Sequence, residues 1–214
     1  MLPRSVPTVL LTRHGETTWN RDGRLQGWAP TPLTDRGHEQ ARSLAAAVAA
    51  EYDVDRIVAS DLRRARQTAT YLADRVGHDP TFESAWRERD FGRYQGLPHE
   101  TVFEDHERLS LARAGRDAVD ARPESGEALR EVRERVLSGW ERLLAESGPD
   151  ETVVVVAHGG PLYLLLGAVD GRDIVSALVE GEQHNCALNE VRVEDGAPRV
   201  VAENRTDFLD EASA

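Results

Sequence analysis

Two histidines in this sequence stand where apolar runs end, and each is next to a glycine. In "TVLLTRHGETTWN", His14 follows Arg13 and precedes Gly15. In "TVVVVAHGG", His158 precedes Gly159. An imidazole can act as a nucleophile, a guanidinium binds phosphate oxygens in pairs, and glycine lets the backbone approach a ligand closely. These residue types in this order favour an anion site, most naturally one for a phosphoryl group.

The elements that must position these residues are predicted strands, because short apolar runs are typical of strands buried on both faces of a sheet. The Asp-Gly pair at 195–196 separates two β-like runs and predicts a hairpin. The predicted strands cover 8–12, 56–60, 81–86 and 152–157, with a closing pair at 186–203.

Helical patterns alternate with these strands. One helix is predicted over 33–52 with Thr34 as its N-cap, and a second begins at Ser60 as cap and stops at Gly77. A third, at about 126–147, places an apolar stripe along one face. The alternation predicts an α/β fold, a three-layer α/β/α sandwich with a mostly parallel central sheet. In such sheets ligands bind beyond the carboxyl ends of the strands, where both histidines would meet.

The stretch from about 91 to 125 is polar, mixed in charge and weakly periodic. It predicts a small, lid-like helical insertion over the active site. Its acidic residues, together with Phe91, Tyr94 and Phe103, favour a substrate that is less highly charged than a bisphosphorylated one. No internal repeat or low-complexity linker divides the sequence, so we predict one domain over 1–214.

Charge and composition exclude several function classes. The chain has 26 basic and 38 acidic residues, a formal net charge of −12, and no lysine at all. Without lysine there is no Walker A phosphate loop, no kinase-type ATP lysine and no Schiff base. An acidic chain gains little from counterion release, so nucleic acid is not an expected partner. The acidic, lysine-free surface suits a high-salt cytoplasm, a hypothesis that predicts higher activity and melting temperature in molar potassium chloride.

The remaining signals concern location, metal and assembly. The longest apolar runs, 152–157 and 161–169, are shorter than the roughly 20 residues of a membrane helix, and the first residues do not resemble a secretory signal. We therefore expect a cytoplasmic protein that binds no membrane. Cys186, the single cysteine, is predicted to be a buried apolar residue. His99-Glu100 lacks a second histidine at 103, so no metal or cofactor is predicted. A homodimer is compatible with the sequence, which carries no signal for it.

Two candidates have ordinary alternatives. The run "LRRAR" would usually be a solvated helix face, and helical spacing does not choose among Arg63, Arg64 and Arg66 as a phosphate ligand. Glu88, in "WRERDFG", is compatible with a plain surface carboxylate. Spacing alone does not decide either case.

Taken together, six blocks resemble the histidine phosphatase superfamily, which includes the cofactor-dependent phosphoglycerate mutases. The resemblance covers nearly the whole chain and implies a phosphoglycerate mutase-like fold. Six blocks in the same order give a very small probability that the similarity arose by chance. The blocks are "LTRHGETTWN", "GRLQGWAPTPLTDRG", "ASDLRRARQTA", "WRERDFGRYQG", "PESGEAL" and "VVVVAHGGPL".

By this resemblance His14 is the nucleophile that becomes phosphorylated, and Glu88 is the proton donor. Arg13, Arg64 and His158 would form the phosphate pocket, so the family pattern selects Arg64 where spacing did not. The other matched positions are expected to line the substrate site: Gly15, Asn20, Gln26, Gly27 and Gly159.

These roles make a metal-independent reaction. His14 must be neutral to attack phosphorus, and the flanking arginines would lower its pKa. His158 would meet transition-state charge best as an imidazolium. Glu88 can protonate the leaving alkoxide only while neutral, and once ionised it can activate water against phosphohistidine.

The expected function is a phosphomonoester phosphatase for a small phosphorylated metabolite. A cofactor-dependent phosphoglycerate mutase is the alternative, but mutases grip a second charged group, and no lysine or adjacent arginine pair lies between 91 and 125. A third reading, of another class, is a non-catalytic module that binds a phosphorylated ligand.

Overall fold

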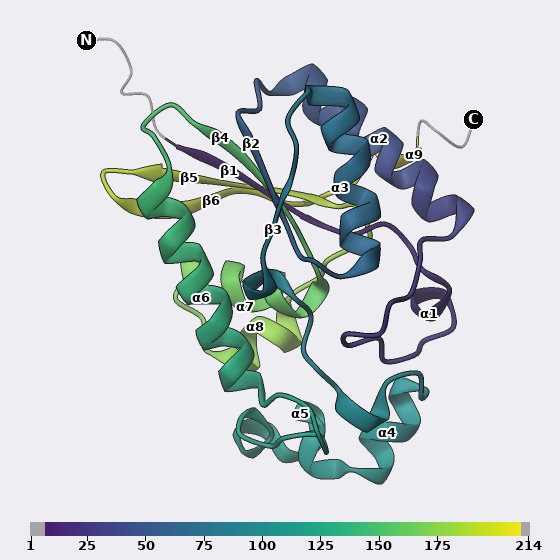
Figure 1. Ribbon diagram of the computed structural model, residues 1–214. Coiled ribbons are helices and arrows are strands. Elements are labelled where there is room, and N and C mark those ends of the chain that lie inside the picture. Colours follow the sequence, from purple (N-terminus) through teal and green to yellow (C-terminus); the bar gives the residue numbers. More distant parts are fainter. Residues whose placement is uncertain (1–6, 211–214) are drawn as a thin grey trace.

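A six-stranded sheet organises the computed structural model, which describes residues 7–210 (Figure 1). The first four strands in sheet order are parallel, and the last two are antiparallel to their neighbours. The mostly parallel sheet predicted from the sequence is therefore confirmed. In sheet order the strands are β3 (Thr81–Phe82), β2 (Arg56–Ala59), β4 (Thr152–Ala157), β1 (Thr8–Arg13), β5 (Leu188–Glu194) and β6 (Ala197–Arg205).

Helices cover both faces of the sheet, which confirms the three-layer sandwich (Figure 1). Leu10 packs with the helices of one face, and its neighbours Val9 and Leu11 pack with those of the other. Because both faces are buried, apolar residues follow one another without alternation. One face carries α2 (Asp35–Glu51) and α3 (Arg63–Val76), and the other α6 (Leu129–Glu146), α7 (Gly159–Val169) and α8 (Ile174–Glu180).

Two predicted helix ends are confirmed and one is wrong. The Thr34 hydroxyl accepts a hydrogen bond from the Gly37 N–H at 3.0 Å, as an N-cap does. Gly77 ends α3 with a left-handed φ of 83°. Ser60, however, is not the cap of α3, because the helix begins later, after Leu62. The Ser60 hydroxyl is turned toward the end of β4, where it contacts a histidine described below.

The strand predicted over 81–86 is also shorter than expected. β3 ends at Phe82, and Ser84–Trp86 forms a 3₁₀ turn that buries the Trp86 side chain. The Asp-Gly hairpin is confirmed, with φ of 51° at Asp195 and 81° at Gly196 between β5 and β6. None of the helices within 7–210 is long and apolar enough to cross a membrane.

The stretch between β3 and α6 contains short helical pieces rather than a further strand. In Figure 1 they lie beyond one end of the sheet, below α6 and α8. The pieces are α4 (His99–Asp105), α5 (Leu111–Ala114) and 3₁₀ turns at Gly92–Tyr94, Glu107–Leu109 and Gly115–Val119. We call residues 91–119 the excursion. Two further short helices, α1 (Thr18–Arg21) and α9 (Asp207–Asp210), follow β1 and β6.

Candidate active site

Strands β1 and β4 end side by side and place the two motif histidines together. Arg13 pairs in register with Ala157, so the next residue of each strand is a histidine. The His14 N–H donates to the Ala157 carbonyl at 3.1 Å, and the two imidazole ring centres are 5.0 Å apart. Both histidines are buried, with exposed fractions of 2% for His14 and 0% for His158. The sheet therefore unites residues 144 positions apart in sequence.

The His14 ring is held in one tautomer. Its Nδ1 lies 2.7 Å from the Gly15 carbonyl oxygen, which can only accept, so Nδ1 carries the proton in the neutral ring. Its Nε2 accepts a hydrogen bond from the Arg64 Nε–H at 3.1 Å. The ring thus presents the lone pair of Nε2, the atom available for attack, to the guanidinium of Arg64.

The pKa of His14 is well below its ordinary value. Burial is the largest cause, and the positive charges of Arg64 and Arg13 lower the pKa further. The sequence argument named the arginines, while the fold adds desolvation as the stronger effect. The result is a neutral imidazole at the pH of a cell.

Arg64 is the arginine of its cluster that enters this site. Its side chain is 1% exposed, whereas Arg63 and Arg66 lie on the exposed side of α3. Its two terminal nitrogens donate to the carbonyls of Gly27 at 2.8 Å and Ala29 at 3.1 Å. Burial lowers the pKa of Arg64 to about 10, so the guanidinium keeps its charge at neutral pH.

Arg13, the last residue of β1, is the second arginine beside His14. Its NH1 donates to the Gln183 carbonyl at 2.7 Å, and its Nε is buried with no hydrogen-bond partner among the described residues. The side chain of Gln183 is fixed in turn by two hydrogen bonds with Asn189, at 2.9 and 3.0 Å. Burial lowers the pKa of Arg13 as well. A buried guanidinium N–H without a partner is suited to an incoming anion.

His158 is oriented by Ser60, which directly follows β2, the strand that pairs with β4 on the side away from β1. Its Nε2 lies 2.8 Å from the Ser60 hydroxyl, and its Nδ1 is buried without a partner among the described residues. Burial first, and then the charge of Arg64, hold its pKa well below the usual range. The imidazolium favoured by the sequence argument is therefore not the state of this ring before an anion binds.

Glu88 lies at the start of α7. Its Oε2 accepts from the Gly160 N–H at 3.4 Å, and its Oε1 accepts from the Arg89 N–H at 2.9 Å. A Cβ on residue 160 would lie 2.3 Å from Oε1, so only glycine leaves room for this carboxylate. Glu88 is thus a positioned residue at the site, not a freely solvated one.

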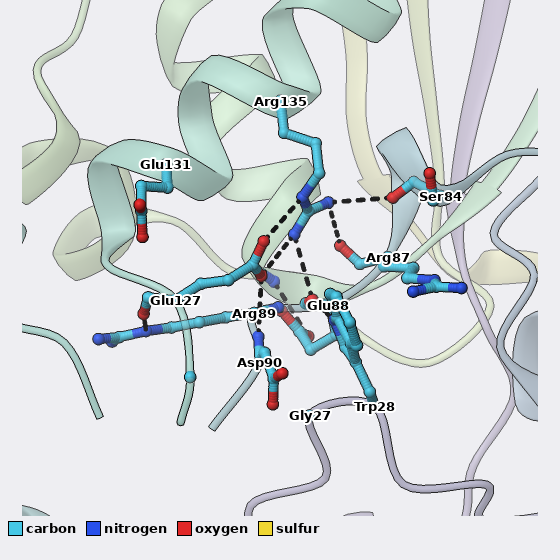
Figure 2. Close-up of polar contacts among 12 residues, drawn as sticks. Gly27, Trp28, Ser84, Arg87, Glu88, Arg89, Asp90, Glu127, Glu131 and Arg135 are labelled. Carbon is cyan, nitrogen blue, oxygen red and sulfur yellow. Dashed lines mark hydrogen bonds and ion pairs between the residues drawn. The ribbon is translucent and has the colours of Figure 1, made fainter. Parts of the chain in front are cut away.

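A network that the sequence did not reveal holds the Glu88 backbone (Figure 2). Arg135, from α6, donates to the carbonyls of Arg87 at 2.8 Å and Glu88 at 3.3 Å and forms two hydrogen bonds with the Glu127 carboxylate, at 2.8 and 3.1 Å. The Trp28 indole N–H also donates to the Glu88 carbonyl, at 2.8 Å. The one sequence signal for Glu127 was its place in "PESGEAL"; Arg135 had none.

The other expected substrate-site residues have different surroundings. Gly15 donates its N–H to the Thr68 hydroxyl at 3.1 Å, and its missing side chain makes room for the Gly37 backbone. Gly159 lies against the Arg13 guanidinium and the Tyr163 ring. These glycines permit close packing around the two histidines.

Asn20, Gln26 and Gly27 form the loop side of the site. The Gln26 side-chain oxygen Oε1 accepts from the hydroxyls of Thr17 at 2.9 Å and Thr31 at 2.8 Å, and Gly27, with φ of 50°, offers its backbone carbonyl to Arg64. Asn20 accepts from the Thr17 backbone N–H at 3.1 Å. These bonds shape the loop that fixes the buried arginine.

A cavity of about 610 Å³ opens from the Arg13 and Glu88 side of the site. It runs under the excursion and between α6, α7 and α8. Its other lining residues are Arg89, Phe91, His99, Phe103, Leu109, Ser110, Leu111, Leu129, Gly160, Tyr163 and Leu178.

One further residue-level prediction, for Cys186, can be compared with this geometry. Cys186 is fully buried, as expected, and burial raises the pKa of its thiol. Within residues 7–210, no three histidine, cysteine, aspartate or glutamate side chains are grouped so as to hold a metal ion.

Comparison with known proteins agrees with the geometry. The family model for the histidine phosphatase superfamily (branch 1) matches residues 9–206. The chain belongs to this superfamily. Members of the histidine phosphatase superfamily transfer phosphoryl groups through phosphohistidine. The predicted family is therefore confirmed.

Relatives of this histidine phosphatase carry two kinds of name. A glucosyl-3-phosphoglycerate phosphatase of Mycolicibacterium vanbaalenii is 36% identical over 188 residues, which cover 85% of this chain and 82% of the relative. A probable phosphoglycerate mutase of Citrobacter koseri is 33% identical over 206 residues, covering 93% and 92%. Among solved structures, a mycobacterial glucosyl-3-phosphoglycerate phosphatase complexed with VO3 has a TM-score of 0.82 at 30% identity, covering 93% and 99%.

Proposed function

We propose that this histidine phosphatase hydrolyses a phosphomonoester of a small metabolite through a phosphohistidine at His14. The observation that carries the proposal is the state of His14: a buried, neutral ring with its proton fixed on Nδ1 and its Nε2 lone pair beside a guanidinium. A nucleophile must have an unprotonated lone pair at neutral pH, and Nε2 provides one once a substrate oxygen takes over the hydrogen bond from Arg64.

In the first step, His14 Nε2 attacks phosphorus in line with the ester oxygen. The substrate phosphoryl group replaces Nε2 as a hydrogen-bond acceptor for Arg64, and Arg13 Nε and His158 Nδ1 offer further contacts for its oxygens. A substrate that arrives as the monoanion can pass its remaining proton to His158, which turns the neutral ring into an imidazolium whose two N–H groups both donate. These groups are already in place, so they stabilise the transition state without reorganising.

The same step breaks the bond between phosphorus and the ester oxygen. A protonated Glu88 gives its proton to the departing alkoxide, and the alcohol leaves through the cavity that Glu88 lines. In the second step the Glu88 carboxylate takes a proton from water, the water oxygen attacks phosphorus, and the bond to His14 Nε2 breaks. The products are inorganic phosphate and the original imidazole.

A phosphoglycerate mutase is the second candidate, because one group of relatives carries that name. A mutase must hold a substrate carboxylate or second phosphate beside the reacting group. The cavity lining offers Arg89 for this, but its Nε and NH2 already donate to the carbonyls of Glu127 at 2.9 Å and Ala121 at 3.0 Å. We therefore place hydrolysis first.

Release of p-nitrophenol from its phosphate tests the proposal, with His14→Ala as the decisive variant. Wild-type protein should turn over the ester and form an acid-labile phosphoenzyme, and the variant should lose both, with activity falling at least about 1,000-fold. A protein that binds inorganic phosphate but never turns over would be the non-catalytic binding module. Faster formation of 2-phosphoglycerate than of phosphate from 3-phosphoglycerate would establish the mutase.

Three predictions about the setting remain part of the proposal. We place the protein in the cytoplasm, with a small phosphorylated metabolite as its partner and no nucleic acid or membrane. Cell fractionation and binding assays with nucleic acid or lipid vesicles test them. A homodimer is tested by light scattering of the purified chain.

A further inference from the structure

We propose that the alcohol released by this enzyme is uncharged and largely apolar. In the substrate, an aromatic or branched aliphatic group would lie next to the phosphate. The inference rests on the proposed function and goes beyond it by naming the chemical class of the leaving group. It follows from the walls of the cavity that continues from Arg13 and Glu88.

The cavity wall beyond the phosphate end is mainly hydrocarbon. Three of its residues are aromatic and four are leucines. The excursion supplies one side, and α6, α7 and α8 supply the other, so an apolar group would be enclosed by two parts of the fold. The apolar residues are Phe91, Phe103, Leu109, Leu111, Leu129, Tyr163 and Leu178.

Arg89, the arginine of this wall beyond the phosphate end, already has two backbone partners. Arg13 and Glu88 belong to the phosphate end. Arg89 is 4% exposed, donates to two backbone carbonyls, and lies with its guanidinium 5.2 Å from the centre of the Phe91 ring. Burial is the main cause that lowers its pKa to about 10. This arginine thus stiffens the wall, and the Nε–NH2 edge that would meet a carboxylate side-on is already taken by two backbone carbonyls.

His99 is the remaining wall residue that can carry charge. It is exposed at the start of α4, and its ring meets the Phe103 ring edge to face, with centres 5.6 Å apart. A single exposed imidazole is a weak partner for an anion compared with a buried guanidinium. The wall thus discriminates against a second anionic group, because desolvating such a group without a partner is costly.

The size of the cavity fits the same inference. At about 610 Å³ it falls within the range of small-molecule sites, far larger than a phosphate ion needs. Apolar walls of this extent gain binding free energy in proportion to the apolar area they cover. A substrate with a ring or branched chain would use this energy, whereas a two-carbon ester would not.

The test compares three alkyl phosphates whose alcohols have similar basicity: 2-phenylethyl phosphate, ethyl phosphate and 3-phosphoglycerate. We expect kcat/KM for 2-phenylethyl phosphate to exceed the other two values by about 10- to 100-fold, the range for burying one aromatic group. A kcat/KM for 3-phosphoglycerate that equals or exceeds the phenylethyl value would overturn the inference alone. If the wild type turns over none of these esters or p-nitrophenyl phosphate, the proposed function fails and the inference fails with it.

Three variants locate the effect in the cavity. Phe103→Ala should lower kcat/KM for 2-phenylethyl phosphate about 10-fold and leave that for ethyl phosphate within about twofold. Phe82→Ala, at an exposed phenylalanine outside this cavity, should change neither value. Leu111→Arg should shift preference toward 3-phosphoglycerate. Equal losses for both alkyl esters in Phe103→Ala would show a purely structural role and overturn the inference.

Discussion

The proposed site has two ends that are built in different ways. The phosphate end consists of Arg13, His14, Arg64 and His158, and the leaving-group end is the cavity beneath the excursion. At the phosphate end, His14 and His158 follow two neighbouring parallel strands whose register fixes them, and each is nearly inaccessible to solvent. At the leaving-group end, much of the wall belongs to the excursion, a series of short helices and turns. The geometry of the phosphate end therefore depends on strand pairing in the sheet, whereas that of the leaving-group end depends on how the short helices and turns of the excursion pack.

The difference explains how one chemistry can serve several substrates. Hydrogen-bonding groups at strand ends are held by the core, so their geometry changes little when surface residues change. Short helices over the site can change sequence without disturbing the core. Glu88 lies between the two ends. Its carboxylate accepts from the first turn of α7, and its backbone carbonyl accepts from Arg135, which Glu127 holds in turn.

Among the variants that test this comparison, the largest expected effect separates the buried Arg64 from its exposed neighbour Arg63. Arg64→Ala removes a donor at the reacting atoms and should lower kcat about 100- to 1,000-fold, whereas Arg63→Ala should stay within about threefold. Steady-state hydrolysis of p-nitrophenyl phosphate measures both. Equal losses in the two variants would mean that the phosphate end is not organised around Arg64.

The next effect tests how strongly burial affects the two histidines of the phosphate end. Because the pKa values of His14 and His158 are lowered in the folded protein, the unfolded chain binds more protons below about pH 6.5, and stability falls as pH falls. Between pH 7.5 and 5.5 the free energy of unfolding should drop by up to about 2–3 kcal/mol, or about 100-fold in the equilibrium constant. Urea titrations measure the drop.

A matched pair of variants assigns that pH dependence. His158→Gln should remove about half of the drop, since one of the two neutral buried rings is gone. His78→Gln, at an exposed histidine, should retain the whole drop. A pH dependence unaffected by His158→Gln would contradict the role given to burial.

A smaller effect probes the connection between the two ends. Arg135→Met removes the donor that holds the carbonyls of Arg87 and Glu88, so kcat should fall about 10-fold while the inhibition constant of inorganic phosphate stays nearly unchanged. Arg142→Met, on the same helix but paired with Glu83, is the control. Equal weakening of phosphate inhibition and kcat would indicate general damage rather than misplacement of Glu88.

The smallest expected effect concerns the surface outside both ends. With a net charge of −12, the folded chain repels itself at low salt, and molar potassium chloride screens this repulsion. The melting temperature should rise by about 2–4 °C, equivalent to about 1 kcal/mol, and activity should rise with it. Thermal unfolding and turnover at low and molar salt measure this, and no rise in either would remove the high-salt hypothesis.

Prediction from sequence succeeded where a local pattern corresponds to one local structure. The valine run at 152–157 and the Asp-Gly pair at 195–196 each favour one backbone conformation, and both were placed correctly. Ser60 shows the limit: its residue type suits an N-cap, but its hydroxyl meets His158, a residue brought near by sheet pairing. Sequence distance carries no information about such a partner.

The sequence by itself determined which residues we propose to handle phosphate, the histidines, arginines and glutamate of the motifs, and the strand ends that carry the two histidines. The tertiary structure decided which arginine is buried, why His158 is neutral before substrate binds, and that Arg135 holds the Glu88 backbone. The physical reason is that residue type fixes the chemical groups that a side chain carries, while burial and non-local hydrogen bonds fix its charge state and its orientation.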